Sequence, residues 1–320
     1  MAVAVCRGRA RSPLVWIGGK YYSVTHVLAA LPPAHGLPQV HSSMPSRGVT
    51  HVLAALPPAQ DYDVYCEPMG GAAHVLASKL EGSHVEIYND VNRDLVNFWM
   101  WVRDLPEVLE ERLRSLPYSR VLYYQYHASL YDGTELDSLE RAVRWFYVLR
   151  SSFSACVGPC PYGWSASGSK NQARSYQNAL SLFEAVSERF RYVQLDSRDF
   201  AEVMTQYQGP RVLFYVDPPY IGCEDYYRDE TGAARFTRAD HERLAVLLNQ
   251  TEAKVALSYY AHPHLEEWYP PDRWRRLSWA TVKHAQRTHV RRDAGQEVLL
   301  MNYPESVGLR AINLDLWSER

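Results

Sequence analysis

The segment Asp217-Pro218-Pro219-Tyr220 directly follows the apolar run VLFYV, and its residue types suit the handling of an amino group. Open α/β sheets place their ligand sites just beyond the carboxyl ends of strands. The Asp217 carboxylate and the Pro218 carbonyl would accept hydrogen bonds from an exocyclic amino group, whose lone pair is otherwise delocalised into its ring, as a methyl group arrives. The two prolines stiffen the backbone, and Tyr220 could stack on a flipped-out base. A Pro-Pro turn that merely ends a strand has the same four letters, so the motif must be interpreted with its neighbours.

A second candidate segment is the turn Glu67-Pro68-Met69-Gly70-Gly71-Ala72-Ala73, which lies between a predicted strand and a predicted helix. Small residues let a cofactor approach the backbone closely. The turn lacks the glycine pattern of dinucleotide binders and the Lys-Ser/Thr pair of a phosphate loop, so NAD and ATP are disfavoured. The acidic run Glu86-Ile87-Tyr88-Asn89-Asp90 follows and could accept hydrogen bonds from ribose hydroxyls. The two segments together predict a site for an adenosyl cofactor without a pyrophosphate.

A third segment, Trp16-Ile17-Gly18-Gly19-Lys20, combines two glycines with an aromatic ring and a cation. This composition suits a loop that closes over a bound molecule, although an ordinary glycine turn would look the same.

The elements that must position these segments alternate between strand and helix. Strands are expected at 62–66, 84–88, 191–195, 211–216, 254–258 and 297–303, and helices at 72–79, 93–102, 200–207 and 237–250. Such alternation predicts a mostly parallel, Rossmann-like sheet with helices on both faces. The interval 151–175, rich in Gly, Ser and Pro, breaks the alternation. We therefore expect a discontinuous catalytic domain, 12–103 and 191–306, and a smaller inserted domain at 104–190.

Positive charge is concentrated locally, although the formal net charge of the chain is only −2. The stretch 141–183 has five basic residues, no acidic residue and several interleaved aromatic rings, and 273–293 holds a second basic run. Phosphate binding needs such a local excess rather than global charge. A solvated face is the alternative for a charge run alone, and the aromatic rings favour nucleic-acid contact in the first stretch.

The segment VTHVLAALPPA occurs twice, at 24–34 and again at 49–59. We interpret this as a tandem duplication in which one copy forms the native helix and the other is looped out on the surface. The sequence does not indicate which copy is native.

Composition narrows the class of protein further. No apolar run is long enough to cross a bilayer, and the N-terminus lacks the apolar core of a signal peptide, so we expect a cytoplasmic protein without membrane contact. The five cysteines are scattered, which predicts free thiols rather than disulfides or a zinc site. No metal is expected.

In this order, the segments resemble the adenine-specific DNA methyltransferases that have an N-terminal WxGGK segment, of the phage and bacterial type. The similarity covers most of the chain outside 21–60 and 104–190, and RSSFSACVGPCPYGW at 150–164 resembles the substrate-recognition insert of these enzymes. The matching segments are PLVWIGGK (13–20), YCEPMGGAAHVL (65–76), EIYNDVNRDLVNFW (86–99), LDSRDF (195–200), FYVDPPY (214–220), FTRADHERLA (236–245), VALSYY (255–260) and EVLLMNY (297–303).

The resemblance implies transfer of a methyl group from S-adenosylmethionine to the amino group of a flipped adenine in double-stranded DNA, by a site-specific enzyme of the kind found in restriction-modification systems. A monomer would suffice. The residues implied for the cofactor are Trp16, Gly18, Gly19, Lys20, Glu67, Pro68, Gly70, Gly71, Ala72, Asp90, Asp199, Phe200 and Asp217. Those implied for the target base are Asp217, Pro218, Pro219 and Tyr220. Those implied for DNA are Arg150, Ser152, Phe153, Trp164, Lys170 and Arg174.

The chain departs from the family pattern at two places, because Met69 stands where Phe is usual and Ala73 where Gly is frequent. Two alternative functions stay open. One is an amino-methyltransferase that acts on cytosine or on RNA, although amino-cytosine enzymes more often resemble SPPY at this place. The other is a DNA-binding homologue whose catalysis is impaired by the duplication.

Overall fold

The computed structural model describes most of the chain, and the WIGGK segment (16–20) and the first copy of the duplication lie outside the described residues. The described residues are 10–14, 47–79, 83–155, 157–159, 163–168, 170–222, 236–282 and 294–304.

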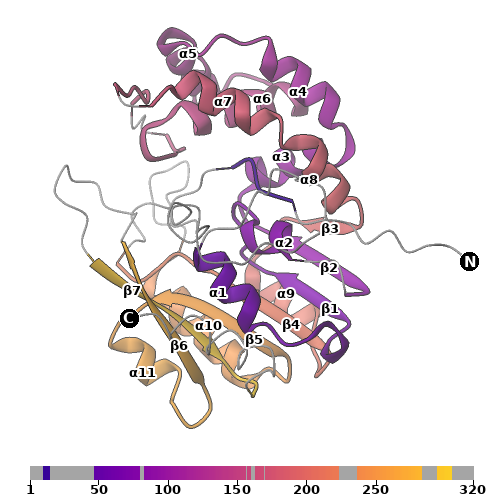
Figure 1. The fold of residues 1–320 in the computed structure, drawn as a ribbon, viewed down its shortest axis with the longest axis vertical. Coiled ribbons are helices and arrows are strands. Elements are labelled where there is room, and N and C mark those ends of the chain that lie inside the picture. The colour runs from indigo at the N-terminus through magenta and orange to yellow at the C-terminus, as the bar shows by residue number, and fades with distance from the viewer. Residues whose placement is uncertain are drawn as a thin grey trace, which may run out of the picture.

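A seven-stranded sheet in the order β3-β2-β1-β4-β5-β7-β6 forms the centre of the fold (Figure 1). Its strands are β1 (Val64–Glu67), β2 (Val85–Asn89), β3 (Val193–Asp196), β4 (Val212–Val216), β5 (Lys254–Tyr260), β6 (Arg275–Val282) and β7 (Ala294–Met301). Strands β1 to β5 pair in parallel, and β7 runs antiparallel to both β5 and β6. The expected mostly parallel sheet is confirmed.

The order of the strands reverses direction beside β1. From β1 the chain moves outward through β2 to β3, and then returns to add β4 and β5 on the other side of β1. Ligands of open α/β sheets bind at such a switch point, beyond the carboxyl ends of the two central strands, here β1 and β4. The glycine turn follows β1 and the Asp217 segment follows β4, so both leave the sheet at this switch point.

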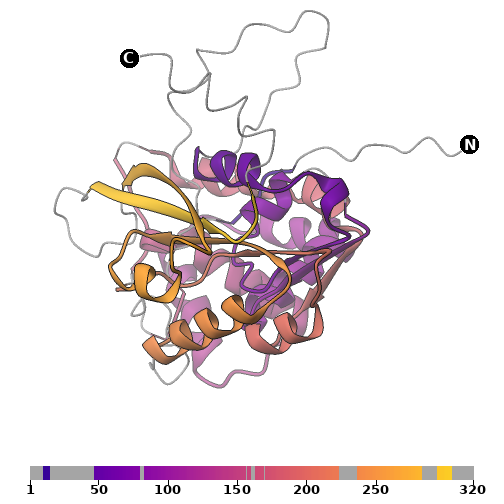
Figure 2. The same ribbon diagram turned by 90° about the horizontal axis from the view of Figure 1, so that it is seen from below.

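Side chains alternate between the two faces of the sheet, as the period of a strand requires. Tyr65 and Tyr215 point into one hydrophobic core, whereas Cys66 and Phe214 point into the other. The second core is covered by α9 (Phe200–Gln206), α10 (Arg238–Gln250) and α11 (His264–Trp268), and the first by α1 (Arg47–Ala55), α2 (His74–Ser78) and α3 (Arg93–Asp104). Figure 2 shows α1 and α10 on opposite sides of the sheet. The expected helices on both faces are therefore present.

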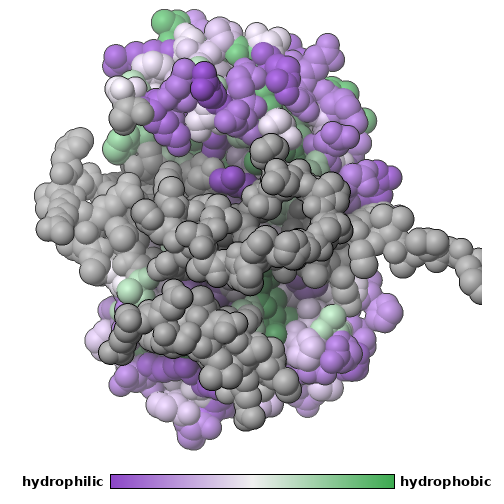
Figure 3. All heavy atoms as spheres, in the orientation of Figure 1, coloured by the Kyte–Doolittle hydropathy of each residue, from purple (hydrophilic) through white to green (hydrophobic). Residues whose placement is uncertain are grey.

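A layer of helices, which the chain forms after β2 and before β3, makes up the upper part of the molecule in Figure 1. It contains α4 (Pro106–Arg114), α5 (Arg120–Tyr131), α6 (Ser138–Ser151), the 3-10 turn η2 (Phe153–Ala155), α7 (Gln172–Leu180) and α8 (Phe183–Phe190). Its centre is α6, in which Phe146 stacks on Phe98 of α3 with ring centroids 5.0 Å apart. Side-chain caps begin the helices at Ser119, Asp137 and Asn171. The described surface of this layer is mostly hydrophilic on the face shown in Figure 3.

The second copy of the duplicated segment forms α1 and continues into η1 (Ala59–Asp61). Val49, Val52 and Ala55 are buried in the first core. His51 stacks on Trp279 of β6 with ring centroids 4.8 Å apart, and the Tyr303 hydroxyl donates to the Ala55 carbonyl at 3.0 Å. This copy is therefore built into the fold.

Strand β6 was not expected from the sequence, which we interpreted there only as a basic run. The strand lies at the edge of the sheet, where charged residues are tolerated. Its alternate residues Leu277 and Trp279 pack against the first core. Arg276 donates to the carbonyls of Leu265 and Tyr269 at 3.0 and 3.4 Å, so part of the basic run holds α11 in place. Within the described ranges, no helix is long and apolar enough to cross a membrane.

Candidate active site

The glycine turn after β1 is shaped by its contact with Tyr88 of β2. A Cβ atom on Gly70 would lie 2.2 Å from Cε2 of the Tyr88 ring, so no larger residue fits there without displacing the ring. Gly71 has a φ of 49° and Ala73 a φ of 53°, and this left-handed region favours glycine. The left-handed backbone at Ala73 therefore explains why glycine is frequent at this position in the family pattern. The Tyr88 hydroxyl donates to the Gly71 carbonyl at 2.7 Å.

Asp90, which follows β2, fastens this turn from the neighbouring strand. Its Oδ2 accepts from the Gly71 backbone N–H at 3.0 Å, and its Oδ1 accepts from the Asn92 backbone N–H at 2.8 Å. The side chain is only partly buried. The structure thus brings together two of the segments that the sequence assigned to one site.

Asn89 is a site residue that the sequence interpretation missed. Its amide nitrogen donates to the carbonyls of Pro68 and Arg198 at 2.8 and 3.0 Å, and its Oδ1 accepts from the Arg198 backbone N–H at 2.9 Å. It is fully buried, and it joins the loops after β1, β2 and β3. The sequence feature that could have identified Asn89 is its polar amide at the end of an apolar strand, because a buried polar group requires hydrogen-bond partners.

Asp199 and Phe200 lie after β3, at the start of α9. Asp199 caps the helix by accepting from the Ala201 backbone N–H at 2.9 Å, and its other oxygen accepts from Arg243 at 2.6 Å. The Arg243 guanidinium lies 4.4 Å from the centre of the Phe200 ring. The two residues thus occupy the third loop at the carboxyl edge of the sheet, beside Asp90 and the glycine turn.

The Asp217 segment leaves β4 with its tyrosine turned inward. The Tyr220 hydroxyl lies 2.9 Å from Asp217 Oδ1, 3.0 Å from Ser258 Oγ and 3.2 Å from Glu297 Oε1. Its ring packs edge-on against Tyr260 at 4.5 Å. Tyr220 is buried, whereas Asp217 and Pro219 are partly exposed. Ser258 and Glu297, on β5 and β7, were not assigned to the site from the sequence.

The charge of Asp217 acts on Glu67, which lies at the end of the neighbouring strand β1. Glu67 is 2% exposed, and this burial raises the pKa of its carboxyl to about 8. The hydrogen bond from the Tyr65 hydroxyl, at 2.7 Å, acts against that rise, and the negative charge of Asp217 adds to it. The ends of β1 and β4 therefore present two carboxyl groups to one region, and one of the two resists ionisation.

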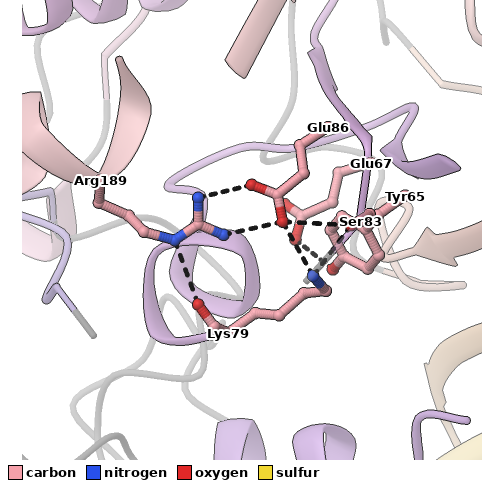
Figure 4. Close-up of polar contacts among 6 residues, drawn as sticks. All are labelled: Tyr65, Glu67, Lys79, Ser83, Glu86 and Arg189. Atoms are coloured by element: carbon pink, nitrogen blue, oxygen red, sulfur yellow. Dashed lines mark hydrogen bonds and ion pairs between the residues drawn. The ribbon is translucent and has the colours of Figure 1, made fainter. Parts of the chain in front are cut away.

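A buried ion cluster joins Glu86 of β2, Lys79 and Arg189 of α8 (Figure 4). Glu86 of β2 accepts from Lys79 Nζ at 2.8 Å and from Arg189 of α8 at 2.6 and 3.1 Å. Burial alone would raise the pKa of Glu86, but the hydrogen bonds and charges of Arg189 and Lys79 lower it. Arg189 also donates to the Lys79 carbonyl at 3.1 Å. Glu86 is thus held in this cluster, and of the two acidic residues of the run, Asp90 is the one at the carboxyl end of the strand.

The residues expected to contact DNA divide into two groups. Phe153 is 54% exposed, and Lys170 and Arg174 are exposed as well. Arg150 instead donates to the Ser175 carbonyl at 2.9 Å. Ser152 and Trp164 form an isolated β-bridge that holds the segment carrying Phe153, and the Trp164 ring lies 5.4 Å from that of Tyr118.

Two other arginines of the basic stretch are held within the protein. Arg141 forms an ion pair with Asp94 of α3, and Arg144 Nε donates to the Glu140 carboxylate at 2.8 Å. The positive charge that this stretch offers to an external partner is therefore concentrated at Lys170 and Arg174. Among the described residues, no group of three or more His, Cys, Asp or Glu side chains is placed to hold a metal ion. Cys66 is a buried free thiol.

The sheet order and the two loops that leave the adjacent ends of β1 and β4 are the features of a Rossmann-like methyltransferase. The sequence matches the family of D12 class N6 adenine-specific DNA methyltransferases over residues 49–284. The chain belongs to this family. It is also similar to the type II methyltransferase M1.LlaDCHI of Lactococcus lactis subsp. cremoris, with 30% identity over 236 residues, which cover 66% of this chain and 76% of the relative.

The family match begins at Val49, the first residue of the second copy of the duplication. The copy that aligns with the family is therefore the same copy that forms α1 in the structure.

Proposed function

We propose that this chain is a site-specific enzyme that transfers a methyl group from S-adenosylmethionine to the exocyclic amino group of an adenine flipped out of duplex DNA. The observation that carries the proposal is the position of its two key loops. The glycine turn follows β1 and the Asp217 segment follows β4, and these are adjacent parallel strands in which Cys66 pairs with Phe214. A cofactor in the first loop and a base in the second would therefore meet.

The residues around the glycine turn fit an adenosyl cofactor. Gly70 packs closely on the Tyr88 ring, which fixes the position of the turn, and the small residues that follow allow a ligand to approach the backbone. Glu67, Pro68, Gly71 and Ala72 would line the methionine part. Bound there, S-adenosylmethionine supplies an activated methyl group on a sulfonium sulfur.

The acidic residues that follow β2 and β3 would hold the rest of the cofactor. Asp90 is partly exposed at the carboxyl end of β2, where it would accept from the ribose hydroxyls. Asp199 would accept from the adenine amino group of the cofactor, and Phe200 would pack against its ring. We assign Trp16, Gly18, Gly19 and Lys20 to closure over the cofactor on the resemblance alone.

Asp217 and the Pro218 carbonyl would hold the target amino group. Each accepts one of its hydrogen bonds, which shifts electron density onto the nitrogen and aligns its lone pair with the methyl group. Pro219 keeps the two acceptors in fixed positions, and Tyr220 would support the base from one side. After transfer the nitrogen carries an extra proton, for which Asp217 is the nearest base.

The exposed Phe153, Lys170 and Arg174 would contact DNA, with the ring as an apolar wedge and the two cations on phosphates. Arg150, Ser152 and Trp164 would act by supporting this segment. The proposed partner is double-stranded DNA, the enzyme would act as a monomer in the cytoplasm, and no metal takes part.

Incubation of the protein with methyl-labelled S-adenosylmethionine and unmethylated duplex DNA tests the proposal. Label should enter the DNA with the unchanged chain and with Asp132→Ala, a change at an exposed aspartate between α5 and α6, and should not enter with Asp217→Ala. Labelling that persists in Asp217→Ala would contradict the assigned role of Asp217. Cofactor and DNA binding without any transfer would favour the catalytically impaired homologue.

A further inference from the structure

The hydroxyl of Tyr220 lies among acceptors from three separate segments. Asp217 comes from the end of β4, Ser258 from β5 and Glu297 from β7, and each places an oxygen within 3.2 Å of the hydroxyl. A tyrosine hydroxyl carries one hydrogen, so it can donate to only one of these oxygens at a time. Two of the three are carboxylate oxygens, which are stronger acceptors than a neutral hydroxyl.

Glu297 is an unusual residue for its place in the sheet. It is 6% exposed and precedes the apolar residues Val298 to Met301 of β7. Burying a carboxylate is costly unless donors surround it. Trp279 Nε1 donates to its Oε2 at 3.0 Å, while Ser258 and Tyr220 lie 3.4 and 3.2 Å from its Oε1. One oxygen of Glu297 is therefore held by β6, and the other faces the Asp217 segment.

The position of the Tyr220 hydrogen decides how good an acceptor Asp217 is. When Tyr220 donates to Asp217 Oδ1, that oxygen has lost one lone pair and part of its electron density. The proposed reaction requires Asp217 to accept strongly from the adenine amino group. A second carboxylate within reach of the same hydroxyl offers the hydrogen another acceptor.

We infer that Glu297 is a positioning residue that draws the Tyr220 hydrogen bond away from Asp217 when the target amino group arrives. The inference rests on the proposed function. The Tyr220 O–H bond does not break, because the hydroxyl only rotates from Asp217 Oδ1 to Glu297 Oε1. Ser258 completes the rearrangement, since its hydroxyl can then donate to the Tyr220 oxygen at 3.0 Å.

The first test is Glu297→Gln, which keeps the shape of the side chain and removes its charge. The Tyr220 hydrogen should then stay on Asp217, so kcat should fall by about 10-fold to 100-fold, the effect of losing a charge-assisted hydrogen bond in the transition state. The dissociation constants for cofactor and DNA should change by less than about threefold, because Glu297 is buried and lies outside the loops that we assign to cofactor and DNA. Glu266→Gln, a change at an exposed glutamate of α11, is the matched control and should keep full activity.

A double-mutant cycle with Tyr220→Phe separates this role from a merely structural one. Tyr220→Phe removes the hydroxyl that competes for Asp217, so it should reduce kcat less than Glu297→Gln does. Added to Tyr220→Phe, the change Glu297→Gln should then alter kcat by less than about twofold, because the effects are coupled through one hydroxyl.

Equal losses from Glu297→Gln in the two backgrounds would overturn the inference, and would place the effect in the contacts with Trp279 instead. An unchanged kcat in the single variant would overturn it too. If Glu297→Gln does not fold, the same cycle is run with Glu297→Asp, which withdraws the carboxylate from Tyr220, and the same coupling is expected. Failure of the unchanged chain to methylate DNA would instead count against the proposed function.

Discussion

The Asp90 carboxylate accepts a hydrogen bond from the backbone N–H of Gly71 at 3.0 Å, so the loop after β2 holds the turn after β1. Nineteen positions separate the two residues, and their contact is made possible by the parallel pairing of the strands that precede them. The cofactor site that we propose depends on this contact, because a turn of small residues would otherwise have many conformations.

Asp90→Ala should therefore weaken cofactor binding by about 10-fold to 100-fold, the equivalent of losing one or two hydrogen bonds to a charged group. The global fold should persist, because Asp90 is only partly buried. Titration calorimetry with S-adenosylmethionine measures the effect, and Asp132→Ala is the control. Unchanged affinity would remove Asp90 from the cofactor site.

Gly70→Ala should damage the site sterically. The added methyl group would lie 2.2 Å from Cε2 of Tyr88, and Tyr88 is fully buried and cannot turn away freely. We expect a loss of about 1–3 kcal/mol in the free energy of unfolding, together with weaker cofactor binding. Gly168→Ala is the matched control, since nothing lies within 4 Å of its added methyl group. Denaturant unfolding of both variants checks the prediction, and equal stability would contradict it.

Glu67 should make the stability of the free protein depend on pH. Its pKa rises from an ordinary 4.5 to about 8 in the folded chain, so the folded state binds a proton more tightly than the unfolded state does. The stabilising contribution of protonated Glu67 is complete below pH 4.5 and is lost as the pH rises through about 8. Glu67→Gln cannot ionise and therefore does not lose this contribution. The melting temperature of the variant minus that of the unchanged chain should increase as the pH is raised from 5 to 8.

Asp217→Asn should reduce this pH dependence, because the charge of Asp217 contributes to the raised pKa of Glu67. A difference in melting temperature between Glu67→Gln and the unchanged chain that is constant across this pH range would show that Glu67 ionises normally.

The two copies of the duplicated segment should respond differently to the same substitution. His51→Ala removes the stacking on Trp279 and should cost about 0.5–1.5 kcal/mol of unfolding free energy. His26→Ala is the identical change at the corresponding position of the first copy, and we expect a smaller effect, because α1 of the second copy already fills the place beside Trp279. Urea unfolding of the two variants measures the loss of unfolding free energy that each substitution causes. A larger loss from His26→Ala would assign the native helix to the first copy.

Local patterns predicted most of the sheet. The apolar runs that become β1, β2, β4 and β5 are bounded by turn residues, and each was placed to within a few residues of its observed position. Strand β6 was not predicted, because an edge strand with charged residues has no clear local pattern. The alternation of strands and helices predicted a mostly parallel sheet, but the order of its strands, which makes β1 and β4 neighbours, is known only from the structure.

Long-range contacts could not be predicted in this way. Arg189 and Glu86 are 103 positions apart, and Tyr220 and Glu297 are 77 apart. Nothing in the neighbourhood of either residue in the sequence indicates its partner. A buried acid beside apolar residues, as at Glu86 and Glu297, signals only that some partner must exist. The fold supplies the partner, and the polar surroundings of Asp217 are therefore known only from the structure.

The proposed reaction is defined by the chemical identity of the methylated base. Digestion of the DNA to nucleosides after incubation with labelled cofactor, followed by chromatography, identifies this base. With the unchanged chain we expect label in N6-methyl-2′-deoxyadenosine alone, and with Asp217→Ala we expect none. Label in N4-methyl-2′-deoxycytidine, or label that is unaffected by Asp217→Ala, would show that the proposed reaction is wrong.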